Sequence, residues 1–123
     1  MSRDYTNVVQ LAKGTVTTPS GGSSGTVIAN IFGYAAFYLS GIQVLTKTAG
    51  AQTTSEFLVR KKGTTTAIAT ITVGTTAADT VLVGRPADAS ALLDAGTCYE
   101  CVAKVTDASI VYDFEVYGTV PYE

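Results

Sequence analysis

The residues with the clearest capacity for chemistry are Cys98 and Cys101, which are spaced as C-x-x-C. This spacing occurs in redox-active dithiols and in one half of a zinc site. A zinc site needs two further ligands, and the chain has no histidine and no third cysteine. Residues 97–105 read as a strand, in which positions three apart point to opposite faces, so an intrastrand disulfide is geometrically unfavourable. We expect Cys101 to be a small core residue, Cys98 to face the other side, and no metal to be bound.

The acidic residues offer a second possible chemistry. Asp113 and Glu115 would lie on one face of a strand, roughly 7 Å apart, a separation that a glycosidase could use. Alternating acids on a strand more often form a solvated face. Three further acids fall near turns but lack the dense oxygen-ligand spacing of a calcium loop: Asp79, Asp88 and Asp94.

The missing histidine removes the commonest general base and excludes Ser-His and Cys-His nucleophilic schemes. The segment 21–25, Gly-Gly-Ser-Ser-Gly, lacks the lysine and the strand-before, helix-after context of a phosphate-binding loop. We therefore predict that the protein is not an enzyme, with no catalytic residues and no cofactor.

The distribution of charge limits the kinds of partner. Eight basic and ten acidic residues give a net charge of -2, and the basic residues are scattered, so no nucleic-acid partner is predicted. The one basic cluster, Arg60-Lys61-Lys62, falls at an expected hairpin turn. Such a cluster is typical of a solubilising tip, and a contact role is the alternative.

The elements that must position these residues are strands. Hydrophobic residues make up 46% of the 123 residues and charged residues 15%, which predicts one folded domain rich in strand-favouring Thr, Val and Tyr. The longest apolar stretch, 28–45, is interrupted by polar residues and glycines, so no membrane span is expected. Residues 1–5 are polar and lack the apolar core of a secretory signal, which favours synthesis in a cytoplasm.

From Thr26 onward, alternating apolar segments are separated by turn residues. Between Asp88 and Gly96 we expect one helical turn through Leu92 and Leu93. The pattern predicts an all-β, antiparallel β-sandwich domain over residues 25–123, jelly-roll or immunoglobulin-like, with about eight strands. The clearest strand segments are 26–32, 36–47, 55–61, 65–73, 79–83, 97–105 and 110–117.

Residues 1–24 differ in composition, because a mildly alternating stretch leads into a tract of Thr, Pro, Ser and Gly. We interpret them as an extended N-terminal arm or linker. Two forms remain open: a first strand followed by a loop, or an arm that lies on a neighbouring subunit.

A small sandwich must leave apolar residues on its outside. If Phe57 and Val59 point inward, Leu58 points outward, and Tyr117 lies opposite the inner face of the last strand. Tyrosine is enriched at protein interfaces, although scattered surface residues are the ordinary alternative. We predict a protein interface drawn from Tyr5, Val8, Val9, Leu11, Tyr34, Tyr38, Leu58, Arg60, Lys61, Lys62, Tyr117 and Tyr122.

Five segments between Gly41 and Gly118 together resemble a known kind of module: a strand at 42–45, a strand with a basic turn at 57–65, its return at 67–71, the stretch 92–99, and a final strand at 112–118. This order is similar to the small jelly-roll or immunoglobulin-like sandwich modules of tailed-bacteriophage structural proteins. One departure is Thr97, which stands where those modules usually have Asp after the glycine.

The resemblance implies a non-enzymatic virion protein made in the host cytoplasm. It would bind the major capsid protein on the outer capsid surface and cement adjacent capsomers, as a homotrimer with no nucleic-acid or membrane partner. Many weak contacts on a symmetric lattice would add up through avidity. The alternative is a tail- or fibre-associated receptor- or carbohydrate-binding module. The absence of tryptophan weighs mildly against sugar binding.

Overall fold

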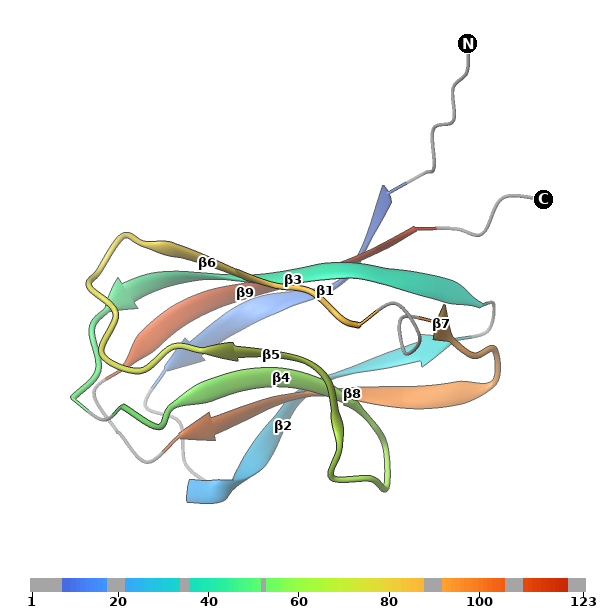
Figure 1. Ribbon diagram of the computed structural model, residues 1–123, viewed down its shortest axis with the longest axis horizontal. Coiled ribbons are helices and arrows are strands. Elements are labelled where there is room, and N and C mark those ends of the chain that lie inside the picture. Colours follow the sequence, from blue (N-terminus) through green and yellow to red (C-terminus); the bar gives the residue numbers. More distant parts are fainter. Residues whose placement is uncertain are drawn as a thin grey trace, which may run out of the picture.

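The computed structural model describes residues 8–17, 22–33, 36–51, 53–87, 92–105 and 110–119. Within these ranges nine strands form two antiparallel sheets that pack face to face, as Figure 1 shows. The predicted all-β sandwich is therefore confirmed. No helix in the described ranges is long and apolar enough to cross a membrane. The strands are β1 (Val8–Thr17), β2 (Gly22–Gly33), β3 (Phe37–Thr48), β4 (Glu56–Lys61), β5 (Ala67–Thr72), β6 (Val81–Gly84), β7 (Leu92–Leu93), β8 (Thr97–Val105) and β9 (Val111–Thr119).

The strand pairing selects the jelly roll from the two sandwiches that the sequence left open. One sheet has the order β1-β9-β3-β6, with β7 also paired to β3, and the other has the order β2-β8-β4-β5. The pairs are nested along the chain: β1 with β9, β2 with β8, β3 with β6 and β7, and β4 with β5. In an immunoglobulin-like sandwich the first two strands share a sheet, whereas β1 and β2 lie in different sheets here.

The core lies between the two sheets and follows the period-2 pattern. The ring of Phe57 on β4 lies 4.9 Å from that of Phe114 and 6.3 Å from that of Tyr112, both on β9, measured between ring centroids. Every second residue of the last two strands is buried wherever its side chain is described: Tyr99, Cys101 and Ala103 on β8, and Ile110, Tyr112, Phe114 and Val116 on or next to β9.

The N-terminal interpretation needs a correction for Val8–Thr17. This segment is β1, a strand of the sandwich that pairs with β9 from end to end. Val16 is buried and Leu11 packs against the core, so the strand contributes to the hydrophobic interior. The expected boundary after residue 24 falls inside β2. Of the two forms left open, the first strand is the one observed, and residues 1–7 and 18–21 lie outside the described ranges.

The helical turn expected between Asp88 and Gly96 is also wrong where it can be compared. Residues 88–91 lie outside the described ranges, but Leu92 and Leu93 form β7 and pair with Tyr38 and Phe37 of β3. Leu93 is buried in the core. Pairing with β3 and burial of one leucine outweigh the weak local preference for a capped turn.

Candidate functional site

The candidate site is the outer face of the sheet formed by β1, β9, β3 and β6. Because Tyr112, Phe114 and Val116 of β9 point into the core, the residues between them point away from it. The register then aligns side chains across the four strands in rows on this face. Two of these rows are Val81, Leu45, Asp113 and Thr15, and Val83, Gln43, Glu115 and Lys13.

Exposed apolar side chains gather on this outer face. Among the described residues eight large hydrophobic side chains are exposed, and six of them belong to this sheet. The other two, Val27 and Phe32, lie on β2 in the opposite sheet. An apolar patch on one face is a feature of interaction surfaces, whereas scattered apolar residues are ordinary. The six residues are Val8, Tyr38, Leu45, Val81, Val83 and Leu92.

The centre of the face is polar and internally hydrogen-bonded. The hydroxyl of Tyr117 donates to Oε1 of Glu115 at 2.8 Å, and the amide of Gln43 donates to the same oxygen. The amide of Gln10 donates to the Tyr117 hydroxyl at 3.3 Å. These bonds cross β1, β9 and β3, so they hold the Tyr117 side chain in place.

The same hydrogen bonds set the ionisation of the two groups. The bond from Tyr117, and then that from Gln43, lower the pKa of Glu115 below its ordinary value. The bond to Glu115 raises the pKa of Tyr117. A glycosidase acid needs a raised pKa, so Glu115 is unsuited to that role.

Asp113, the other acid of the suggested pair, is occupied in a similar way. It accepts a hydrogen bond from the Thr15 hydroxyl at 2.6 Å, and its carboxylate lies 3.6 Å from the ammonium of Lys47. Both acids therefore belong to a cross-strand polar ladder. This agrees with the solvated-face interpretation of the alternating acids.

Two of the shallow hollows on this face lie on the β6 side of the polar centre. One, of about 190 Å³, lies between β6 and β9 and is lined by Leu45, Val81 and Asp113, among others. The second, of about 210 Å³, lies beside Gly41 and is lined by Tyr117 and Arg85, among others. The register of β3 against β9 shifts between Leu39 and Gly41, so the pairing of the two strands is irregular beside this hollow.

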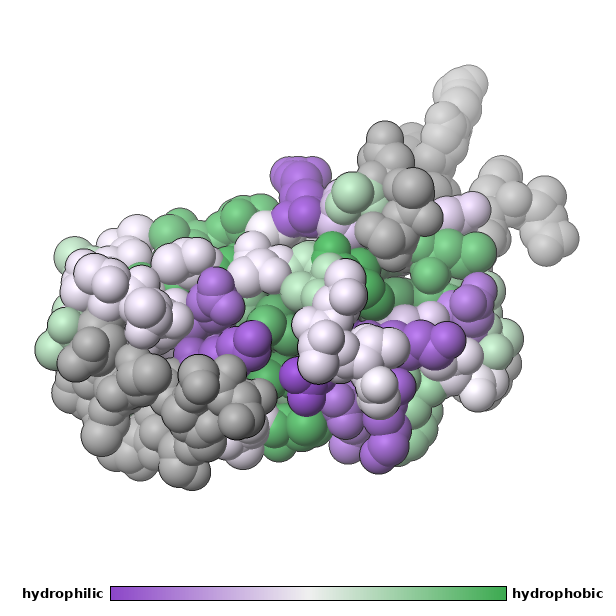
Figure 2. Space-filling view, turned by 60° about the horizontal axis from the view of Figure 1, so that its bottom comes forward, coloured by the Kyte–Doolittle hydropathy of each residue, from purple (hydrophilic) through white to green (hydrophobic). Residues whose placement is uncertain are grey.

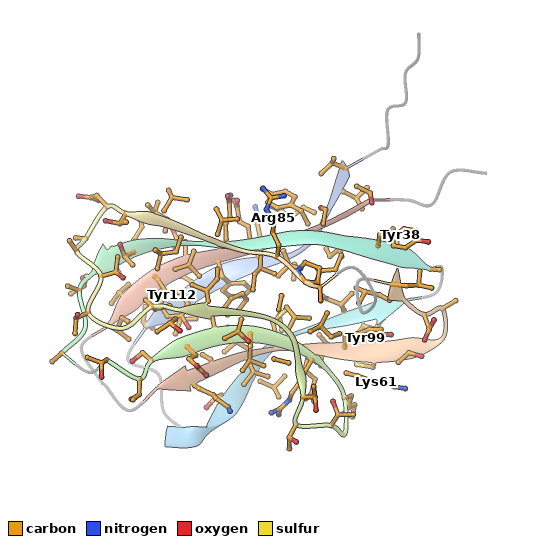
Figure 3. All side chains as sticks on the ribbon, in the orientation of Figure 1. Tyr38, Lys61, Arg85, Tyr99 and Tyr112 are labelled. Carbon is orange, nitrogen blue, oxygen red and sulfur yellow. The ribbon has the colours of Figure 1, made fainter. Side chains whose placement is uncertain are left out.

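Three of the predicted interface residues lie on this face: Val8, Tyr38 and Tyr117. In Figure 3 Tyr38 lies at the right-hand end of the upper sheet and Arg85 projects above it. Leu11 packs against the core, so it is less available than expected, and Val9 next to it in β1 is half-buried. The predicted residues Tyr5, Tyr34 and Tyr122 lie outside the described ranges.

The other four predicted interface residues belong to the opposite sheet and its hairpin. Leu58 lies on the outward side of β4 as expected, but it is only 3% exposed, which corrects its assignment to an open surface. Its cross-strand neighbour Val102 is fully buried too, because the β2 bulge brings Gly25 over it: a Cβ on Gly25 would lie 2.5 Å from Val102 Cγ1. Figure 2 turns this side forward, where hydrophobic residues form a central band between hydrophilic ones.

The basic cluster on the same hairpin is divided. Nε of Arg60 lies 3.1 Å from Oε1 of Glu100, and both side chains are largely buried, so Arg60 is not a free cation. Lys61 and Lys62 are exposed beyond it. The hairpin lysines therefore lie on the opposite sheet from the candidate site and are not part of its outer face. In Figure 3 Lys61 lies at the lower right.

The positions predicted for the two cysteine side chains are confirmed. Cys101 is fully buried, and burial raises the pKa of its thiol to about 12. Cys98 points to the other face and is half-buried, and both thiols are free. Among the described residues no group of three or more metal-ligating side chains is brought together.

Sequence reasoning missed Leu45, Val81, Val83 and Leu92 as surface residues. The sequence predicts a short apolar strand over residues 79–83. Its pairing with β3 turns Leu82 inward and the valines on either side of it outward. The alternation of β3 alone, with Val44 and Thr46 buried on either side of Leu45, was a signal that could have identified Leu45.

Comparisons with known proteins place the chain in no family. No family model matches it, and no curated protein matches it. One solved structure, described as part of Bacillus endospore appendages that form a family of disulfide-linked pili, is similar with a TM-score of 0.47 and 10% sequence identity. That similarity covers 98% of this chain and 96% of the other.

Proposed function

We propose that this protein is a non-enzymatic structural protein of a virion, which binds the outer surface of a phage capsid and cements adjacent capsomers. The outer face of the β1-β9-β3-β6 sheet is the binding surface. The observation that carries the proposal is the gathering of six exposed apolar side chains around a hydrogen-bonded polar centre.

This face has the chemistry of a protein interface. Interface centres are depleted in free charges and enriched in apolar and aromatic groups. Here Asp113 is matched by Lys47, and Glu115 is held by Tyr117 and Gln43. Because the polar side chains are already fixed and the support is a sheet, binding would cost little conformational entropy.

The sequence resemblance to phage structural modules supports the finer part of the proposal. The partner would be the major capsid protein, and the decorating unit would be a homotrimer on the virion surface. A symmetric unit on a symmetric lattice multiplies weak contacts, and binding only to the assembled shell stabilises the shell by mass action.

A second candidate is a tail- or fibre-associated receptor- or carbohydrate-binding module. The observation that favours it is Tyr117, an aromatic ring held beside a hollow of about 210 Å³ that is also lined by Gln43 and Arg85. An aromatic ring with amide and guanidinium neighbours could contact a sugar ring and its hydroxyls.

Electron microscopy of virions that carry the protein tests the proposal and separates the two candidates. Regular density on the capsid supports the cement protein, and density confined to the tail supports the second candidate. Val83→Glu, which places a charge at an exposed position of β6, should empty the capsid sites without unfolding the protein. Val27→Glu, an exposed valine on the opposite sheet, is the matched control and should leave the sites occupied.

A further inference from the structure

We infer that the hollow beside Gly41 is an anchor site for one carboxylate side chain of the partner protein, with Arg85 as its ligand. The inference rests on the proposed function, and it names the chemistry that the partner must present. In Figure 3 Arg85 projects from the upper side of the sheet, where this hollow lies.

The hollow exists because Gly41, at an outward-facing position of β3, has no side chain to fill the space beside Tyr117. Gly41 is the register partner of Tyr117, so both positions face outward. A Cβ built on Gly41 would meet only the carbonyl oxygen of Gly84 within 4 Å, at 3.4 Å. The space over Gly41 is therefore open and bounded by Tyr117, Val83 and Arg85, with Gln43 at its edge.

Arg85 differs from the two lysines of this face because no acidic side chain of the described ranges lies opposite it. Lys47 is matched by Asp113, and Lys13 lies opposite Glu115 in the β1–β9 register. Arg85 is exposed and forms no ion pair or hydrogen bond with another residue of the described ranges. The hollow beside Gly41, which Arg85 lines, includes neither Asp113 nor Glu115 in its lining. This part of the face is therefore complementary to an incoming negative charge.

A carboxylate side chain fits the hollow better than a larger ligand does. A volume of about 210 Å³ is below the usual size of a small-molecule pocket, but it has room for a single side chain. The planar guanidinium can donate two parallel hydrogen bonds to a carboxylate. Val83 and the fixed ring of Tyr117 form apolar walls, and removing water there strengthens the charge interaction.

The test uses the full chain, labelled with ¹⁵N, and two capped tripeptides, Val-Glu-Val and Val-Gln-Val. The glutamate peptide should shift the amide signals of Gly41, Arg85 and Tyr117 and saturate. The glutamine peptide should bind at least about tenfold more weakly, because charge-assisted hydrogen bonds are roughly twice as strong as neutral ones.

Variants assign the binding to the hollow. Arg85→Gln should abolish the preference for glutamate. Arg85→Lys should weaken it, because an ammonium cannot donate two parallel hydrogen bonds to the carboxylate as the planar guanidinium does. Gly41→Thr fills the open space and should block binding while the protein stays folded. Lys62→Gln removes an exposed cation from the opposite sheet and should change nothing.

Two results with the peptides would overturn the inference: equal affinity for both peptides, or full binding of the glutamate peptide by the Arg85→Gln variant. Tighter binding of galacturonate, a sugar that carries a carboxylate, than of the glutamate peptide would also overturn it. Decorated particles separate this failure from that of the proposed function. If Val83→Glu empties the capsid sites but Arg85→Gln and Gly41→Thr do not, the anchor is wrong and the capsid role stands. If the peptides are discriminated but no capsid density exists, the capsid role is wrong and the anchor stands.

Discussion

Phe114 of β9 packs against the opposite sheet. Its ring packs 4.9 Å from that of Phe57, and it is 2% exposed. We predict that Phe114→Ala lowers the free energy of unfolding by about 3–5 kcal/mol, because the truncation removes buried area and leaves a cavity. Urea denaturation measures this cost. Phe32→Ala, at a position 74% exposed, should change it by less than about 0.5 kcal/mol, and equal costs for the two variants would contradict the assigned core.

The two thiols should differ in reactivity. Cys101 is fully buried with its pKa raised to about 12, whereas Cys98 is half-buried on the outer side. We predict that a thiol reagent at pH 8 modifies one cysteine per folded chain, Cys98, and two in denaturant. The Cys98→Ser variant is the control and should show no modification until it unfolds. Rapid reaction of that folded variant would contradict the burial of Cys101.

The contribution of Glu115 to the stability of the folded protein should depend on pH. Its folded pKa is lowered by the hydrogen bonds from Tyr117 and Gln43, so its contribution to stability is present above the ordinary glutamate pKa of about 4.3. That contribution is lost as the pH falls through the lower, folded pKa. We predict that the carboxyl signal of Glu115 in NMR titrates at a lower pH than an ordinary glutamate, and that Tyr117→Phe moves the midpoint upward. An unchanged midpoint in that variant would show that the hydroxyl does not set it.

At the residue scale the sequence predicted the inward alternation of β8 and β9, because that pattern depends only on strand period. It did not predict the burial of Leu58, because the neighbours of that side chain are set by the pairing of β4 with β5 and β8. Nor did it show that Arg60 is matched by Glu100, which needs the pairing of β4 with β8.

At the scale of elements, β1 is the strand whose role differs most from the sequence-based interpretation. It covers one side of β9, and Gly14 leaves the room that the ring of Phe114 occupies: a Cβ there would lie 2.9 Å from the ring. We predict that removing residues 1–17 abolishes the cooperative thermal transition, measured by circular dichroism, because an edge of the core is uncovered. Val8→Ser, at an exposed position of the same strand, should leave the transition unchanged. A truncated chain that melts like the full chain would contradict this role.

Strand existence was predictable, but strand partners were not. The expected segment 97–105 coincides with β8, and other segments differ from their strands by a few residues at their ends. Alternation cannot distinguish a jelly roll from an immunoglobulin-like sandwich, since both use the same local pattern. The sequence predicts a helical turn for Leu92 and Leu93, whereas they form β7, because two residues carry too little periodicity to indicate a strand.

At the scale of the whole molecule, the nested pairing gives the two sheets different outer surfaces. Among the described residues, most of the large apolar side chains that are exposed belong to the β1-β9-β3-β6 sheet. Leu58 and Val102 on the other sheet are buried. The interface residues predicted from the sequence belong to both sheets. Only the three-dimensional arrangement separates Val8, Tyr38 and Tyr117 from Leu58 and the hairpin lysines.

Electron microscopy of purified virions, at a resolution that orients the jelly roll, is the sharpest test of the proposed capsid role. We expect regular density on the capsid surface, in groups of three, with Val81 and Val83 of β6 turned toward the shell. Density with the β2-β8-β4-β5 sheet against the shell, or density on the tail with none on the capsid, would contradict it.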